Sequence, residues 1–100
     1  MSDGYLYLAK KHGRAYLSPG KMSEHHFWLL ADVSSLHSEK VINALRDFLV
    51  FGYTRKEACE RHNVSPGYFS GALNRFQRVN QTVDKLVPFY LSEASPTYPG

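Results

Sequence analysis

The stretch TRKEACERHNVSPGYFSGALNRFQRV, residues 54–79, predicts two short helices joined by a tight turn. Thr54 is followed three residues later by Glu57, a spacing typical of a capping box at the start of a helix. We expect this first helix to run to about His62. Asn63 then tolerates the left-handed backbone conformation that a sharp exit from a helix requires.

The second helix of the pair is predicted to begin at Ser65 and Pro66, an N-cap followed by a proline in the first helical position. A helix-turn-helix also needs a small residue where its two helices cross, and Cys59 has the required size. Apolar side chains must hold the helices together. The residues expected to be buried for this purpose are Val64, Phe69, Ala72, Leu73 and Phe76.

Small or polar residues are left facing outward from the start of the second helix. They are Ser65, Pro66, Gly67, Ser70, Gly71 and Asn74. In a helix-turn-helix, the second helix presents such side chains to base edges in the major groove of DNA. Arg75 and Arg78 follow about one turn later, where they suit phosphate oxygens. An ordinary helical hairpin, or a module that binds another protein, is the alternative interpretation.

The distribution of charge favours DNA over that alternative. Residues 54–80 hold five basic and two acidic residues, so this segment accounts for the net charge of +3 of the whole chain. A protein that binds phosphate groups is expected to concentrate positive charge on its binding surface.

The segment from Met22 to Asn80 resembles the PapB family of adhesin-biosynthesis transcription regulators. Four short motifs carry the resemblance in matching order. They are MSE-x-HF at Met22–Phe27, SS-x-HS at Ser34–Ser38, RKE-x-CE at Arg55–Glu60 and GYFS at Gly67–Ser70. The ends of the chain, about residues 1–18 and 88–100, match only loosely.

The resemblance implies a function in the regulation of fimbrial operons. PapB-like proteins act at operon promoters, assemble as oligomers on AT-rich repeated DNA sites, and work beside regulators such as the leucine-responsive regulatory protein. The family is also associated with contacts to the minor groove, whereas the helix-turn-helix pattern suggests the major groove. The scarcity of long side chains at the outer face of the second helix favours readout of DNA shape. The choice of groove therefore stays open.

The matching motifs also imply roles for single residues. By its position in RKE-x-CE, Arg55 is expected to contact phosphate together with Lys56, and Cys59 to serve in packing. By its position in GYFS, Tyr68 is expected at the DNA face with Gly67 and Ser70, and Phe69 to be buried. The chain departs from the family pattern at Ser65-Pro66, where polar amides are more typical, so base contacts from this pair do not follow from the resemblance.

Composition indicates a single folded domain. The chain has 100 residues, of which 43% are hydrophobic, and one cysteine, which excludes an intrachain disulfide. It contains no apolar run of signal-peptide or membrane-span length. We therefore predict a soluble bacterial cytoplasmic protein, associated with the nucleoid when bound to DNA. Its parts are an N-terminal arm (1–21), a helix-turn-helix domain (22–91) and a flexible tail (92–100).

No catalytic, cofactor or metal site is predicted, and we do not expect an enzyme. Cys59 and His62 have the spacing of a nucleophile and a base on one helix, but no third group is evident that would orient the base. His25 and His26 are adjacent, so on a helix their side chains point about 100° apart and do not readily share one metal ion.

The predicted fold is all-α, with about four to five helices. A helix capped by Ser23 is expected to place Phe27 and Trp28 in the core. A second helix, capped by Ser38, should run to about Phe51 and end at Gly52. Its apolar residues are expected to face inward, and its charged residues to face solvent. Those charged residues are Lys40, Arg46 and Asp47.

The two ends of the chain are described by weaker patterns. Residues 81–90 are expected to continue or restart a helix that lasts until Pro88. Residues 1–21 favour a mobile or strand-like arm that turns at His12-Gly13. A basic arm that reaches along DNA, or one that packs on a second subunit, is the alternative for this region.

Overall fold

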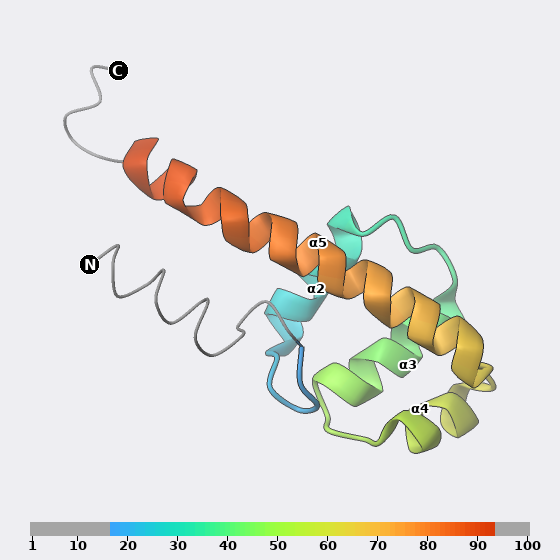
Figure 1. Ribbon diagram of the computed structural model, residues 1–100. Coiled ribbons are helices and arrows are strands. Elements are labelled where there is room, and N and C mark those ends of the chain that lie inside the picture. The colour runs from blue at the N-terminus through green and yellow to red at the C-terminus, as the bar shows by residue number, and fades with distance from the viewer. Residues whose placement is uncertain (1–16, 94–100) are drawn as a thin grey trace.

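The computed structural model describes residues 17–93, and these form four helices with no strand among them (Figure 1). The helices are α2 (Glu24–Val33), α3 (Glu39–Leu49), α4 (Arg55–His62) and α5 (Pro66–Glu93). The prediction of an all-α fold is confirmed. Most of the predicted arm and tail, including the strand pair, falls outside the described residues.

Each of the first three helices begins at the side chain that the sequence predicted. The hydroxyl of Ser23 accepts a hydrogen bond from the backbone N–H of His26, and Ser38 caps α3 in the same way. At the start of α4, the Thr54 hydroxyl accepts from the Glu57 N–H at 3.0 Å. The Glu57 carboxylate in turn accepts from the Thr54 N–H at 2.9 Å. These bonds satisfy backbone donors that have no partner inside the helix.

The core lies where α2, α3 and α4 pack against the first half of α5. Phe27 of α2 stacks on Phe76 of α5 with ring centroids 5.2 Å apart, and Phe48 of α3 meets Phe69 of α5 edge-on at 5.7 Å. All the residues predicted to lock the two helices together are buried. They are Val64, Phe69, Ala72, Leu73 and Phe76.

The prediction that Trp28 is buried is wrong. Its side chain is 42% exposed, whereas that of its neighbour Phe27 is fully buried. Adjacent residues on a helix point about 100° apart, so the two rings do not both face the same core. The Trp28 indole instead lies at the surface, where its Nε1–H donates to the Glu24 carboxylate at 3.2 Å.

Residues 17–22 form a strap across the C-terminal end of α3. The backbone N–H of Gly20 donates to the Phe48 carbonyl at 3.0 Å, and that of Met22 donates to the Leu49 carbonyl at 3.1 Å. These carbonyls lie in the last turn of α3, where no backbone N–H of the helix is left to donate to them. The strap approaches the next loop so closely that a Cβ on Gly20 would lie 3.2 Å from the Gly52 Cα.

Helix α5 is one continuous element of 28 residues, about 42 Å long. The predicted end at Pro88 is wrong, because the helix continues through this residue to Glu93. A proline inside a helix removes the hydrogen bond to the carbonyl four residues earlier, and its ring crowds that carbonyl. The second half of α5 extends past the other helices (Figure 1), so its backbone is open to water, which can satisfy that carbonyl.

Candidate nucleic-acid interface

The turn between α4 and α5 is tight and changes the direction of the chain within three residues. Asn63 adopts the left-handed conformation, with φ of 55°. In this conformation the backbone N–H of Val64 donates a hydrogen bond to the Cys59 carbonyl at 2.9 Å. Ser65 then caps α5, since its hydroxyl accepts from the Tyr68 N–H at 3.2 Å. The predicted turn and cap are both confirmed.

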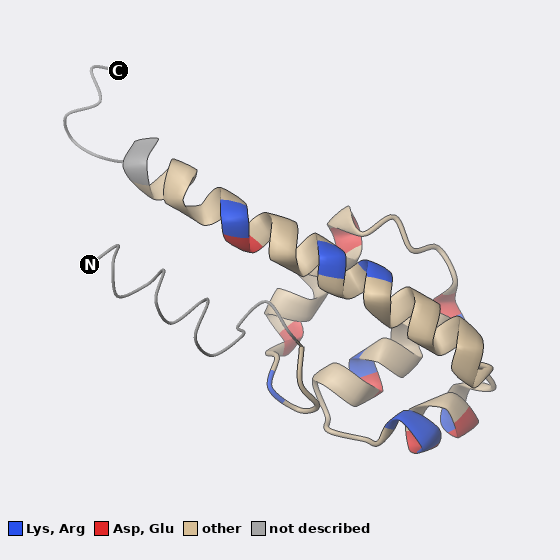
Figure 2. Cartoon of the chain, in the orientation of Figure 1, with Lys and Arg blue, Asp and Glu red and all other residues tan. Residues whose placement is uncertain are grey.

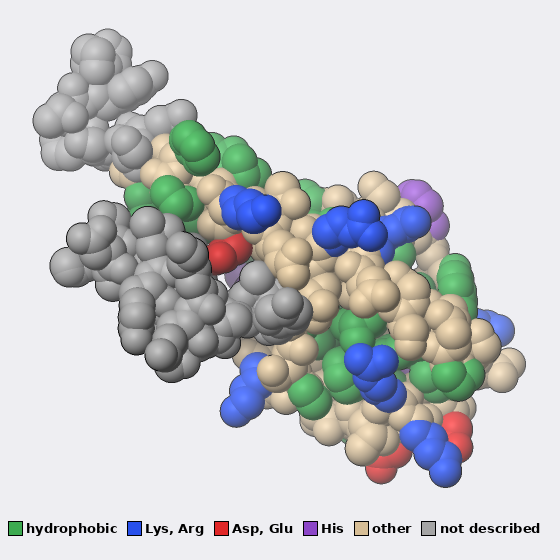
Figure 3. Space-filling view, viewed as in Figure 1, with side chains coloured by type: hydrophobic (Ala, Val, Ile, Leu, Met, Phe, Trp, Pro, Cys, Tyr) green, Lys and Arg blue, Asp and Glu red, His purple; other side chains and the backbone are tan. Residues whose placement is uncertain are grey.

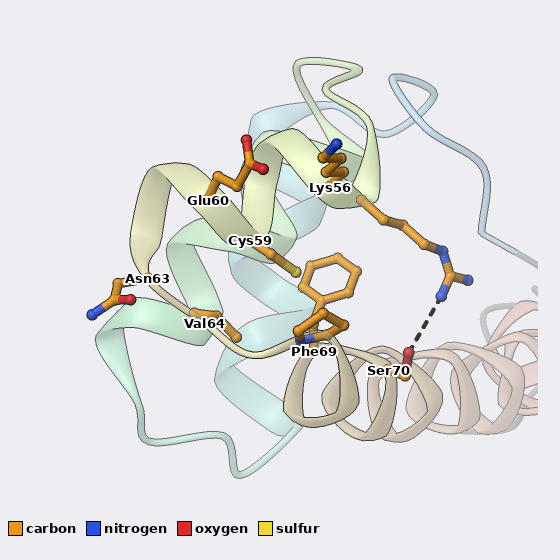
Figure 4. Close-up of a pocket in the computed structure, with 9 residues that line it drawn as sticks. Lys56, Cys59, Glu60, Asn63, Val64, Phe69 and Ser70 are labelled. Carbon is orange, nitrogen blue, oxygen red and sulfur yellow. Dashed lines mark hydrogen bonds between the residues drawn. The ribbon is translucent and has the colours of Figure 1, made fainter.

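A hollow of about 740 Å³ lies between α4 and the start of α5 (Figure 4). It brings together four of the predicted site residues, which are Arg55, Lys56, Pro66 and Ser70. The Cys59 sulfur points toward the Phe69 ring inside this hollow, and both residues are buried (Figure 4). The hollow therefore has an apolar floor and a lining that carries two positive charges, from Arg55 and Lys56, and one negative charge, from Glu60.

The two cations at this rim are only weakly held by the protein. Arg55 Nη1 lies 3.5 Å from the Ser70 hydroxyl, and the guanidinium lies 5.7 Å from the centre of the Phe48 ring. Lys56 is exposed. Within the described part of the chain, no carboxylate forms an ion pair with either residue. Both side chains are thus available to an external anion.

The remaining predicted residues at the start of α5 are on the surface. Ser65, Gly67, Tyr68, Gly71 and Asn74 are all exposed. A Cβ added at Gly67 or at Gly71 would meet no atom within 4 Å. Nothing inside the protein therefore requires glycine at these two positions. Their effect is to leave a flat, open stretch of helix that another molecule can approach closely.

Arg75 and Arg78 lie apart from the hollow. Both are exposed, and both line a separate groove of about 490 Å³ on the flank of α5. The other residues of this groove are Val33, Val79, Thr82, Val83 and Leu86. Basic residues of α4 and of the middle of α5 are nevertheless visible on the same face of the molecule (Figures 2 and 3). The site residues thus form two groups.

Burial raises the pKa of the Cys59 thiol, so the thiol is protonated at neutral pH. The nearby Arg55 acts in the opposite direction but does not overcome the burial. A protonated, buried thiol is a poor nucleophile and behaves as a small apolar side chain. The structure therefore favours packing over chemistry for this residue.

The sequence did not predict a polar cluster of Asp47, Arg61 and His62, which joins α4 to α3 by hydrogen bonds. Asp47 was expected to face solvent, but it is buried, and its Oδ2 accepts hydrogen bonds from Arg61 Nε and His62 Nε2, both at 2.7 Å. The Arg61 guanidinium also lies over the Tyr53 ring, 4.4 Å from its centre. Arg61 and His62 lie 14 and 15 residues away from Asp47, so no local sequence pattern predicts these hydrogen bonds.

These bonds set the ionisation of the buried carboxyl. Burial acts to raise the pKa of Asp47, but the hydrogen bonds from Arg61 and His62 outweigh it and lower the pKa below its ordinary value. Asp47 is therefore ionised at neutral pH, and the positive charge of Arg61 is compensated inside the protein. Arg61 consequently contributes less than Arg55 to the field outside the protein.

The described residues define a small all-helical protein in which a tight turn joins α4 to α5. A family model described as adhesin biosynthesis transcription regulatory protein, PapB, matches residues 2–90. The chain belongs to this family, whose members are transcription regulators of adhesin operons and not enzymes. The predicted family is confirmed.

Individual relatives agree with this assignment. The AFA-III adhesin operon regulatory protein of Escherichia coli is 65% identical over 94 residues, which are 94% of this chain and 92% of the relative. The E. coli regulatory protein PapB of a major pilus subunit operon is 49% identical over 79 residues, covering 79% of this chain and 76% of the relative. The crystal structure of E. coli FocB has a TM-score of 0.72 at 42% identity, covering 90% of this chain and 99% of FocB.

Among residues 17–93, no cluster of three or more His, Cys, Asp or Glu side chains is placed to hold a metal ion. None of the helices in that range is long and apolar enough to cross a membrane.

Proposed function

We propose that this protein regulates adhesin operon transcription in the bacterial cytoplasm by binding double-stranded DNA through its α4–α5 surface. The observation that carries the proposal is the hollow whose rim holds Arg55 and Lys56, neither of which forms an ion pair with a carboxylate among residues 17–93. Both residues belong to the first turn of α4, where the helix dipole adds to the attraction for phosphate.

The outer face of α5 suits close contact with a duplex. Gly67, Ser70, Gly71 and Asn74 leave it nearly free of bulk, with Tyr68 as its single large side chain. Such a surface offers few hydrogen-bonding groups to base edges, so we propose that it reads the shape and deformability of AT-rich DNA. Ser65 and Pro66 would lie at the approach to the groove, and Arg75 and Arg78 beside phosphates further along.

Assembly on DNA is part of the proposal. A single module of this size buries about 600–1,000 Å² on DNA, which is too little for tight and selective binding. We therefore expect a homodimer or a higher oligomer on adjacent sites, associated with the nucleoid. The family resemblance adds co-regulators such as the leucine-responsive regulatory protein as partners at the promoter.

A mobility-shift titration with an AT-rich promoter duplex at several salt concentrations tests the proposal. Wild type should bind with an affinity that falls as salt rises. Arg55→Ala combined with Lys56→Ala should flatten the slope of log affinity against log salt by about two phosphate contacts. Lys21→Ala combined with Lys40→Ala is a charge-matched control, because both lysines are exposed and neither lines the hollow.

An unchanged slope in the double variant would show that the α4 rim does not contact phosphate. Absence of any shift with wild type would favour the second candidate, a module that tethers another regulator. The exposed side chains of Phe89, Tyr90 and Leu91 favour that candidate, since contiguous apolar surface often marks a site of protein contact.

A further inference from the structure

One face of α4 lines the hollow with residues of contrasting character (Figure 4). Lys56, Cys59, Glu60 and Asn63 follow the i, i+3, i+4, i+7 spacing of a single helix face, and all four line the hollow. Lys56 and Glu60 are exposed, whereas Cys59 is buried. The hollow therefore combines a cation, an apolar surface and a carboxylate within five residues of one helix.

Two features of this hollow are not explained by a contact with phosphate. A phosphate is attracted by Arg55 and Lys56, but the carboxylate of Glu60 repels it. A phosphate also gains nothing from an apolar floor, because its charged oxygens lose hydration there. An occupant that accounts for the whole hollow must carry both kinds of charge and an apolar group.

The opposite charges of α4 are not paired with each other. Lys56 and Glu60 are four residues apart, where side chains on a helix are neighbours. Among the residues that the structure describes, however, no ion pair joins them. The order of the two charges is the less favourable one, since a glutamate stabilises a helix better when it precedes the lysine. Each charge is thus open to a complementary group of a ligand.

The Cys59 thiol shows that both kinds of charge lie close to the apolar floor. Burial is the main cause of its raised pKa, and of the two smaller effects Arg55 lowers this pKa while Glu60 raises it. The Cys59 sulfur itself faces the Phe69 ring (Figure 4). A small molecule whose apolar group contacts this floor can therefore reach a cation and a carboxylate at the same time.

We propose that the hollow binds a free α-amino acid with a bulky apolar side chain, and that the bound amino acid displaces DNA. Its carboxylate pairs with Arg55 and Lys56. Its ammonium group pairs with Glu60, and its side chain covers the floor at Cys59 and Phe69. This regulation rests on the proposed function, because displacement requires that DNA phosphates use the same two cations.

A bulky side chain is favoured because the hollow is large. Its volume of about 740 Å³ lies within the usual range for small-molecule sites, about 300–1,000 Å³. An aromatic ring gains further from the Cys59 sulfur and the Arg55 guanidinium, since both groups make favourable contacts with rings. Exposed ion pairs each add little, so we expect a dissociation constant of about 1 mM.

Binding is tested first without DNA, by NMR titration of the 15N-labelled 100-residue chain with L-phenylalanine. The backbone signals of Lys56, Cys59, Glu60 and Phe69 should shift in a saturable manner, with half-saturation at about 1 mM. Glycine, 3-phenylpropanoate and 2-phenylethylamine lack the side chain, the ammonium group and the carboxylate, respectively. Each of them should bind at least about threefold more weakly than L-phenylalanine.

Glu60→Gln isolates the carboxylate that a phosphate contact does not need. The variant should bind L-phenylalanine about threefold to fivefold more weakly. It should bind 3-phenylpropanoate more tightly than wild type does, because a negative charge beside this anion has been removed. Asp32→Asn is the matched control, since Asp32 is exposed on α2 and does not line the hollow, and it should behave as wild type. Circular dichroism checks that both variants stay helical.

Displacement is then measured by mobility shift with an AT-rich duplex at constant salt. L-Phenylalanine at ten times its dissociation constant should raise the apparent Kd for DNA about tenfold, as competition at one site requires. Glycine at the same concentration is the control for general effects of a zwitterionic solute, and it should leave the Kd unchanged.

The possible failures are distinct. Absence of saturable shifts up to about 20 mM L-phenylalanine, or equal affinity of wild type and Glu60→Gln for it, would overturn the proposed site. Binding in the hollow with an unchanged affinity for DNA would overturn the displacement. If wild type gives no mobility shift at all, the proposed function fails, and the NMR titration still decides whether the hollow binds the amino acid.

Discussion

The two ends of α4 carry arginines in opposite circumstances. Arg61, in the last turn, is hydrogen-bonded to the buried carboxylate of Asp47 and stacked on Tyr53. Arg55, in the first turn, has a 3.5 Å contact with the Ser70 hydroxyl and lies 5.7 Å from the centre of the Phe48 ring. The two arginines carry the same formal charge but have different roles. One arginine stabilises the fold, and the other is open to a ligand.

This difference changes how the charge of the chain should be counted. Residues 54–80 have a net charge of +3 when they are counted alone. Asp47 lies outside that range, yet it compensates Arg61. The positive surface available to an anion is therefore smaller than the sequence count suggests, and it lies at the N-terminal end of α4 and around Arg75 and Arg78 of α5.

The largest effect is expected from Asp47→Ala. Removal of one partner from a buried ion pair typically costs about 3–5 kcal/mol. Because Arg61 is half-exposed and is readily hydrated again, we expect about 2–3 kcal/mol, measured by urea unfolding. Asp32→Ala is a suitable control, since Asp32 is exposed on α2 and should change stability by less than about 0.5 kcal/mol. Equal stability of the two variants would refute the structural role of Asp47.

A somewhat smaller effect is expected at the crossing of α4 and α5. Cys59→Leu adds bulk beside Phe69 in a buried contact, and overpacking of this kind costs about 1–3 kcal/mol. Cys59→Ala should lose only about 1 kcal/mol and keep its affinity for DNA. Thermal melts and mobility shifts on both variants check the prediction. A folded Cys59→Ala protein without DNA binding would show that the thiol does more than pack.

The response to acid should depend on the same polar cluster. The pKa of Asp47 is lower in the folded protein than its ordinary value of 3.8. Its contribution to stability is therefore complete above the unfolded pKa and is lost as pH falls through the folded pKa. Asp47→Asn should remove this part of the acid dependence, measured by urea unfolding between neutral pH and about pH 3. A variant whose acid profile keeps the wild-type slope would contradict the assignment.

The local features of the fold were predictable because their causes are local. Thr54 and Glu57 satisfy each other's backbone donors across a single turn. The turn at Asn63 depends only on the ability of asparagine to adopt a positive φ. The buried positions of α5, such as Phe69 and Phe76, follow from helical periodicity. The rim cations Arg55 and Lys56 followed from their place in a matching motif.

The features that sequence reasoning missed depend on distant parts of the chain. Asp47 is a charged residue in an amphipathic helix, and only the approach of Arg61 and His62 makes its burial favourable. Trp28 is as apolar as its neighbour, and the packing of α5 decided which ring entered the core.

The smallest effect on folding, and the sharpest test of the contrast, comes from comparing Arg55→Ala with Arg61→Ala. Arg55→Ala should change stability by less than about 0.5 kcal/mol, because the residue makes only weak contacts within the protein. It should nevertheless lower affinity on every duplex and flatten the salt slope by about one phosphate. Arg61→Ala should destabilise the protein but leave the salt slope of the folded fraction unchanged. If Arg61→Ala flattened the slope as much as Arg55→Ala, both arginines would contact phosphate, and the division between the two ends of α4 would be wrong.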